Sequence, residues 1–221
     1  SYPAMSPVAW STYTTGTDPS VHGIYDFMQL KNDEFRPTTS EDINKPYFWN
    51  QMDRKSVVLN IPMTFPPKEL NGALVSGYLA SKDTTYTYPA ELTEELNSDN
   101  YIIEPLEGGF EEERRGDIEK KMDAAVDKRT DTALKLYERN NPDFFQVTYT
   151  GLDRLQHYYP LQPSEGEYSE AVPQHYQKLD EAIGRIDSEL DDNTTMIIMS
   201  DHGFQKLDRE IYLNHWLKER G

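Results

Sequence analysis

The sequence contains no cysteine, so it can form neither a disulfide nor a thiolate metal site, and cysteine cannot be its nucleophile. No run approaches the ~18 consecutive apolar residues of a membrane-spanning helix, and we therefore expect a soluble chain. Basic residues are few: 22 Lys and Arg stand against 39 Asp and Glu, a net charge of −17. Such a surface repels duplex nucleic acid and anionic lipid, so neither is an expected partner.

The acidic residues are spread along the chain rather than gathered in a tail. Carboxylates distributed in this way keep a surface hydrated in a salt-rich cytoplasm, where charge repulsion is screened. A halophilic, archaeal source with a cytoplasmic location would explain them, and an ordinary acidic protein is the alternative. The chain starts at Ser1 without a methionine and stops at Gly221, just after an expected helix at 212–217, so we expect a fragment.

Hydrophobic residues make up 36% of the 221 residues, enough for one packed α/β domain. Strands are predicted at 56–63, 73–77, 144–149 and 195–199. Helical spacing runs through 111–140 and through a second helix whose stripe is Tyr176, Leu179, Ile183, Ile186 and Leu190. Strands and helices that alternate through long crossovers predict a mostly parallel sheet with helices on both faces. The Pro-, Gly-, Thr- and Tyr-rich region within 28–110 resembles an inserted lid.

Residues 6–16 have the features of a short helix. Ser6 is predicted as its N-cap, Pro7 as its first helical residue and Gly16 as the residue just past its end. The Asp-Pro and His-Gly pairs within 18–23 predict turns.

Two Asp/His clusters follow predicted strands at their carboxyl ends, where ligands bind in open α/β sheets. Asp153 and His157 are four residues apart and can share a metal ion from one helical turn, with a surface ion pair as the alternative. Asp201, His202 and Gly203 directly follow the last predicted strand, with a turn containing a capping Asp and a packed His as the alternative. Asp and His supply the O and N ligands that suit zinc or manganese.

Ser6 has two interpretations. An N-cap serine normally only satisfies backbone donors. The same helix N-terminus also offers N–H groups and partial positive charge to a phosphate, and a metal that lowers the pKa of the hydroxyl would let Ser6 attack phosphorus. The other histidines are predicted to be structural: His22 in a turn, His175 facing solvent on a helix, and His215 beside the C-terminal aromatic residues.

Four sequence blocks occur in a characteristic order: Ser6–Ser11 with His22–Phe27, Asn60–Pro67 with Val75–Gly77, Asp153–His157, and Ser200–Phe204. Together they resemble the alkaline phosphatase superfamily, in particular the prokaryotic phosphohydrolase/phosphomutase-like branch of the type I phosphodiesterase/nucleotide pyrophosphatase family. The resemblance runs over residues 1–221. It implies part of an alkaline phosphatase-like catalytic domain. We expect the lid-like region 28–110 to set the substrate.

The resemblance also implies roles for the candidate residues. Ser6 would be the nucleophile, would touch the second of two divalent metal ions and would become phosphorylated. Asp153 and His157 would hold the first ion, and Asp201 and His202 the second, with Zn²⁺ as the first choice and Mn²⁺ as the other. Family members use a further Asp upstream and a further His near the C-terminus, for which this sequence has no candidate, so we expect the isolated chain to bind metal weakly or to be inactive.

We therefore expect a metal-dependent phosphodiesterase or nucleotide pyrophosphatase that acts on a small phosphorylated substrate through a phosphoserine. A phosphomonoesterase, phosphonate hydrolase or phosphomutase on the same scaffold, and a non-catalytic relative, are the alternatives. Sulfatases of the superfamily use a Cys/Ser-x-Pro-x-Arg segment, whereas Ser6 is followed directly by Pro7 and Val8. The predicted site residues all have chemically competent identities, which favours an enzyme.

Overall fold

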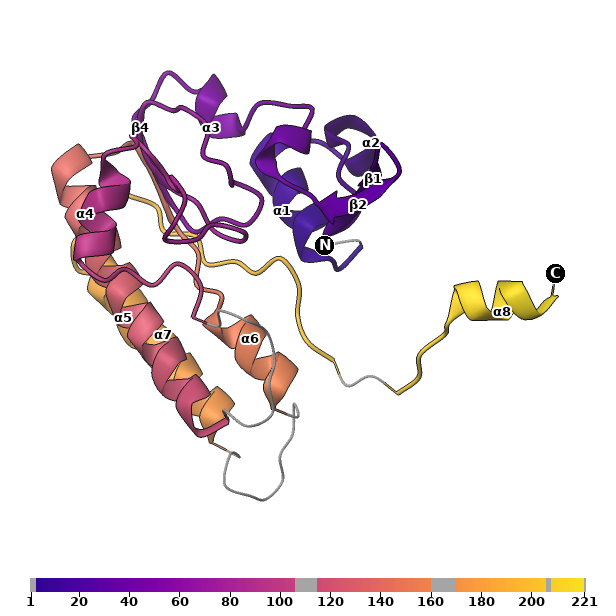
Figure 1. Ribbon diagram of the computed structural model, residues 1–221. Coiled ribbons are helices and arrows are strands. Elements are labelled where there is room, and N and C mark those ends of the chain that lie inside the picture. Colours follow the sequence, from indigo (N-terminus) through magenta and orange to yellow (C-terminus); the bar gives the residue numbers. More distant parts are fainter. Residues whose placement is uncertain (1–2, 106–114, 160–169, 206–207, 221) are drawn as a thin grey trace.

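The computed structural model describes residues 3–105, 115–159, 170–205 and 208–220 (Figure 1). Its centre is a four-stranded sheet in the order β5-β4-β3-β6. The strands are β3 (Ser56–Leu59), β4 (Gly72–Val75), β5 (Thr87–Tyr88) and β6 (Phe144–Val147). β3 pairs in parallel with both β4 and β6, while β5 pairs antiparallel with β4. The sheet is therefore mostly parallel, as predicted.

Helices precede, separate and follow these strands. They are α1 (Ser6–Thr15), α2 (Pro19–His22), the 3-10 turn η1 (Ser40–Asp42), α3 (Phe48–Gln51), α4 (Leu92–Ser98), α5 (Arg115–Asn140), α6 (Gly151–Tyr158), α7 (Ala171–Asp187) and α8 (Leu213–Arg220). Figure 1 shows α4, α5 and α7 on one side of the sheet, α1 on the other, and α8 apart from the body. None of the helices in the described ranges has the length and apolar character needed to span a membrane.

Successive residues of β3 belong to two separate hydrophobic cores, because neighbouring side chains of a strand point to opposite faces. Val57 and Leu59 pack with Ala133 of α5 on one face. Val58 packs on the other face with Trp10 of α1. All three β3 side chains are fully buried, and each contributes about 1.5–3 kcal/mol through the hydrophobic effect. The fold is α/β with helices on both faces of the sheet, which confirms the predicted class.

The predicted buried strand at 195–199 is wrong. The segment forms no strand, and Ile197 and Ile198 are 79% and 70% exposed. Its apolar, β-branched composition favours a strand, but a strand also needs a neighbour that supplies a hydrogen-bonding ladder. Among the described residues none pairs with this segment, since the sheet ends at β6.

The buried stripe of α7 also differs from the predicted one. Tyr176 is 53% exposed, whereas His175, predicted to face solvent, is only 2% exposed. Ala182 and Ile186 complete the buried side of the helix. The apolar spacing indicated a helix correctly, and Ile186 of the predicted stripe is buried. Tyr176 is not, because small and polar residues form part of the buried face, which hydropathy alone does not identify.

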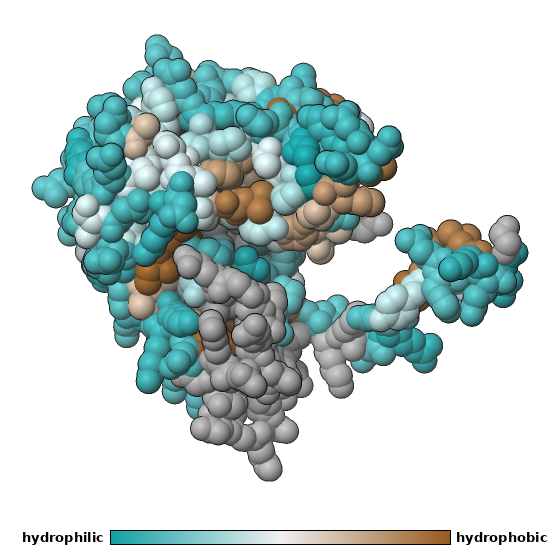
Figure 2. Space-filling view, in the orientation of Figure 1, coloured by the Kyte–Doolittle hydropathy of each residue, from teal (hydrophilic) through white to brown (hydrophobic). Residues whose placement is uncertain are grey.

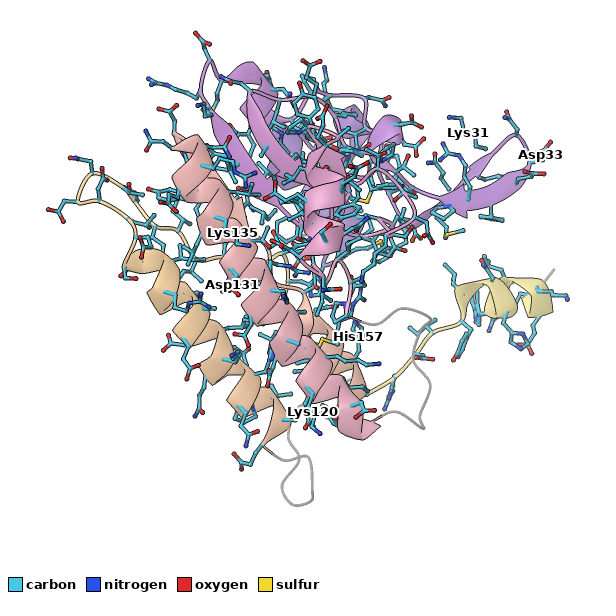
Figure 3. The ribbon with its side chains drawn as sticks, turned by 60° about the vertical axis from the view of Figure 1, so that its left-hand side comes forward. Lys31, Asp33, Lys120, Asp131, Lys135 and His157 are labelled. Atoms are coloured by element: carbon cyan, nitrogen blue, oxygen red, sulfur yellow. The ribbon has the colours of Figure 1, made fainter. Side chains whose placement is uncertain are left out.

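Residues 28–110 contribute β3, β4 and β5 to the central sheet. The same region forms an antiparallel hairpin of β1 (Met28–Lys31) and β2 (Glu34–Pro37), which is separate from that sheet. The hairpin projects from the body (Figure 3). The surface seen in Figure 2 is mostly hydrophilic, in keeping with the net charge of −17. A role of the region in substrate choice stays a prediction.

A buried arginine joins the sheet to the segment that follows α4. Arg129 of α5 is 2% exposed, and its Nη1 donates to the carbonyl oxygen of Thr148, just past β6, at 2.9 Å. Its Nη2 donates to the carbonyl oxygens of Ile103 at 2.9 Å and of Ile102 at 3.4 Å. In the described ranges it has hydrogen bonds to carbonyl oxygens and no ion pair with a carboxylate. Since a buried cation is strongly destabilising without partners, these bonds keep both segments in place.

Replacing Arg129 with Met should lower the free energy of unfolding by about 2–4 kcal/mol, because the carbonyl oxygens of Thr148 and Ile103 would lose buried donors. Urea denaturation at fixed salt concentration measures the change. Arg139→Met is the control, since Arg139 is 52% exposed in a surface pair with Glu95, and its loss should cost less than about 1 kcal/mol. Equal losses of unfolding free energy in the two variants would contradict the role of Arg129 in joining these segments.

Candidate active site

α1 places Ser6 at its first helical position. The N-cap is Met5, with extended backbone (φ −137°, ψ 120°) and no side-chain capping bond, so the prediction of Ser6 as N-cap is wrong by one residue. Pro7 does not determine where the helix begins. Proline is tolerated at any first-turn position whose N–H has no intrahelical acceptor, and here it is the second helical residue instead of the first. Gly16 ends the helix as predicted, in the left-handed conformation with φ 67°.

Ser6 contacts a residue almost at the other end of the chain. Its Oγ lies 2.9 Å from Nε2 of His202. The same nitrogen lies 3.5 Å from Oδ2 of Asp201 and 3.9 Å from Oδ1 of Asp153. The fold therefore brings the first and the last of the predicted motifs together, on side chains of Asp201 and His202 that are less than one-fifth exposed.

The orientation of His202 follows from its second ring nitrogen. Nδ1 lies 3.1 Å from the carbonyl oxygen of Gly203, and this oxygen can only accept, so Nδ1 carries the proton. Nε2 is then the nitrogen that faces the Ser6 hydroxyl. Histidines that ligate metals commonly donate the other N–H to a backbone carbonyl, so this tautomer also suits a metal ligand.

Asp153 and His157 lie on one face of α6, as the four-residue spacing predicted. Oδ1 of Asp153 is 3.7 Å from Nε2 of His157. Burial raises the pKa of Asp153, and the electrostatic influence of His157 and Arg154 opposes that effect. Figure 3 shows His157 on α6, below the sheet in that view.

Two contributions were not predicted from the sequence. Phe204 lies between the motifs, with its ring centroid 4.9 Å from that of His157 and 5.7 Å from that of His202. Arg154 lies beside Asp153 and is paired with Glu104. The sequence pointed to Arg154 only through its position between Asp153 and His157, and no sequence feature pointed to Glu104.

The remaining histidines lie outside this cluster. His22 ends α2, a short helix where turns were predicted, and it is buried. Its Nδ1 accepts from the N–H of Ile24 and its Nε2 lies 3.1 Å from Oγ1 of Thr12, so a neutral ring satisfies both contacts. Burial lowers the pKa of His22, which also favours the neutral ring. His215 is exposed on α8 and lies 3.2 Å from Glu219.

His175 lies directly beneath the start of α6. Its Nδ1 is 3.1 Å from Oδ1 of Asp123 on α5, and its Nε2 has no hydrogen-bond partner among the described residues. A Cβ built on Gly151, the first residue of α6, would lie only 2.5 Å from that Nε2. The absence of a side chain at Gly151 thus allows the helix that carries Asp153 to rest on His175.

The donor atoms suit a divalent metal ion. Ligands that share one ion at 2.0–2.2 Å stand roughly 3–3.6 Å apart. The 3.5 Å between Asp201 and His202 lies within that range, and the 3.7 Å between Asp153 and His157 is close to it. In the described part of the chain, however, no three Asp, Glu or His side chains form a group that could hold an ion. The residues therefore fit a metal as two pairs of donors rather than as complete coordination shells.

A comparison with protein families gives a match over residues 1–221 to the model described as type I phosphodiesterase / nucleotide pyrophosphatase. No curated protein and no solved structure matches the chain.

Gly151→Ala should lower the free energy of unfolding by about 1–3 kcal/mol, because the new methyl group would overlap the ring of His175. Gly184→Ala in α7 is the matched control: its Cβ would meet nothing within 4 Å, so the higher helix propensity of alanine should leave stability unchanged or raised by up to about 1 kcal/mol. Urea denaturation measures both. If Gly151→Ala were as stable as the control, the close contact between α6 and His175 would be refuted.

Proposed function

The chain belongs to the type I phosphodiesterase/nucleotide pyrophosphatase family, and from this premise we propose that it hydrolyses small phosphoric diesters or pyrophosphates through a phosphoserine at Ser6. The family acts on phosphoric esters. The observation that carries the proposal is the 2.9 Å contact between Ser6 Oγ and His202 Nε2, in a cluster that also contains Asp153 and Asp201.

The start of α1 provides a place for the phosphoryl group. Pro7 has no N–H, and the N–H of Ala9 already donates to the Met5 carbonyl oxygen at 2.9 Å. The first-turn N–H groups of Ser6 and Val8 are therefore the donors that a phosphoryl oxygen can use, together with the partial positive charge of the helix N-terminus.

Ser6 Oγ is the attacking atom in this proposal. Because its Nδ1 is held by the Gly203 carbonyl oxygen, Nε2 of His202 is the nitrogen that faces Ser6 Oγ, so both atoms would be ligands of the same ion and the Ser6 proton would leave to water. In-line attack forms the bond from Oγ to phosphorus, and the leaving oxygen departs with the bonding electrons on the opposite side. Water then attacks the phosphoserine, releases phosphate or a monoester and restores the Ser6 hydroxyl.

Asp153 and His157 would hold one divalent ion, and Asp201 and His202 the other, with Ser6 Oγ as a further ligand of the second. Such ions lower the pKa of a hydroxyl and stabilise charge on phosphoryl oxygens. We propose Zn²⁺ first and Mn²⁺ second, because imidazole nitrogens and carboxylate oxygens are mixed in equal numbers at each pair. The net charge of −17 supports a salt-rich cytoplasm as the working environment and a halophilic, archaeal source.

The full-length, metal-reconstituted protein should hydrolyse bis-p-nitrophenyl phosphate faster than p-nitrophenyl phosphate, and a chelator should abolish both activities. The release of p-nitrophenolate measures both rates. A higher rate on the monoester, or equal rates, would contradict the preference for diesters. Turnover that survives exhaustive chelation would contradict the metal requirement.

Ser6→Ala should reduce turnover by at least about 10³-fold, because no other hydroxyl would occupy the attacking position. Ser11→Ala is the matched control in the same helix: its hydroxyl is buried without a hydrogen-bond partner among the described residues, so activity should be unchanged. Mass spectrometry of quenched reactions should detect a phosphorylated peptide that contains Ser6 in the wild type only. Full activity of Ser6→Ala would refute its role as the nucleophile.

A further inference from the structure

Arg154 lies at the border of the candidate active site. It follows Asp153 in α6, and its Nη1 is 3.7 Å from Oδ2 of that residue. Asp153 in turn lies 3.9 Å from His202, which contacts Ser6. The side chain of Arg154 is only 24% exposed, so this cation is largely removed from open solvent.

Glu104 fixes the orientation of the Arg154 guanidinium. Nε donates to Oε1 of Glu104 at 3.2 Å, and Nη2 donates to Oε2 at 3.4 Å. A two-point contact of this kind sets the plane of the group, which a single bond would leave free to rotate. Glu104 is itself only 21% exposed and comes directly after Ile103, which Arg129 holds.

The third nitrogen of Arg154 is left available. At 3.7 Å, Nη1 is too far from Asp153 for a hydrogen bond, and within the described residues it donates to no other acceptor. A guanidinium whose plane is fixed on one edge and whose other edge is open is suited to a phosphate, because its donors match two oxygens at once. If Asp153 binds a metal ion, its negative charge is engaged by the ion and competes less for Nη1.

We propose that Arg154 is a specificity-determining residue that binds a second anionic group of the substrate, next to the phosphoryl group that Ser6 attacks. Glu104 is the positioning residue that holds Arg154 in that orientation. The inference rests on the proposed function and narrows its substrate class to esters with a neighbouring phosphate, such as organic pyrophosphates. A purely structural role, in which Arg154 only ties Glu104 to α6, is the competing explanation.

The test compares two substrates that differ by one phosphate: the p-nitrophenyl esters of thymidine 5′-monophosphate and of thymidine 5′-diphosphate. In the full-length, metal-reconstituted protein, Arg154→Gln should lower kcat/KM for the diphosphate ester about 10- to 100-fold more than for the monophosphate ester, the range expected for hydrogen bonds between charged groups. Arg154→Lys should recover part of the difference, and Glu104→Gln should cause a smaller selective loss. Equal loss on both substrates would overturn the proposal in favour of a structural role.

Arg139→Gln is the matched control, since Arg139 forms a similar two-point pair with Glu95 at 2.6 and 2.9 Å on α5 and α4. It should leave the ratio of the two kcat/KM values unchanged. Calorimetry adds a readout without turnover: inorganic pyrophosphate should bind about 10-fold more weakly to Arg154→Gln than to the wild type, while inorganic phosphate binds equally. Equal pyrophosphate affinities overturn the assignment of Arg154, whereas a wild type that hydrolyses neither ester overturns the proposed function itself.

Discussion

The buried guanidinium of Arg129 is the interaction on which the edge of the site depends. It donates to carbonyl oxygens on two segments, one that continues into α6 and one that continues into Glu104. Asn60, at the end of β3, adds a 3.0 Å bond from its Nδ2 to the Ile103 carbonyl oxygen. Because these carbonyl groups are buried, neither segment can move without losing bonds that water does not replace. The positions of Asp153 and Arg154 follow from this network.

The parts of the fold that were predictable are those set by local pattern. The buried run of β3 and the helical spacing of α5 indicated their elements, and the four-residue spacing of Asp153 and His157 placed both on one face of α6. The segment 195–199 shows the limit of such patterns. Its apolar residues indicate a strand, but whether a neighbouring strand supplies a ladder is a property of the whole sheet and not of the segment.

The contacts that make the site are long-range and carry little local signal. Ser6 and His202 are 196 positions apart, and Glu104 and Arg154 are 50 apart, so no periodicity relates them. The resemblance to a family indicated the first pair, because both residues lie in its motifs. No sequence feature indicated the contact between Glu104 and Arg154, since a glutamate and an arginine at these positions are equally compatible with exposed side chains that do not meet.

The one-residue shift at the start of α1 bears directly on the chemistry. A serine at the N-cap would accept a bond from a first-turn N–H, which typically stabilises a helix by ~1 kcal/mol and occupies both the hydroxyl and one donor. Met5 at the N-cap provides no such bond, so α1 forgoes that stabilisation. In exchange the Ser6 hydroxyl points to His202 at 2.9 Å, and the first-turn N–H groups keep their capacity to bind an anion. The uncapped start of α1 beside two Asp/His pairs is therefore the arrangement on which the proposed binding of a phosphoryl group rests.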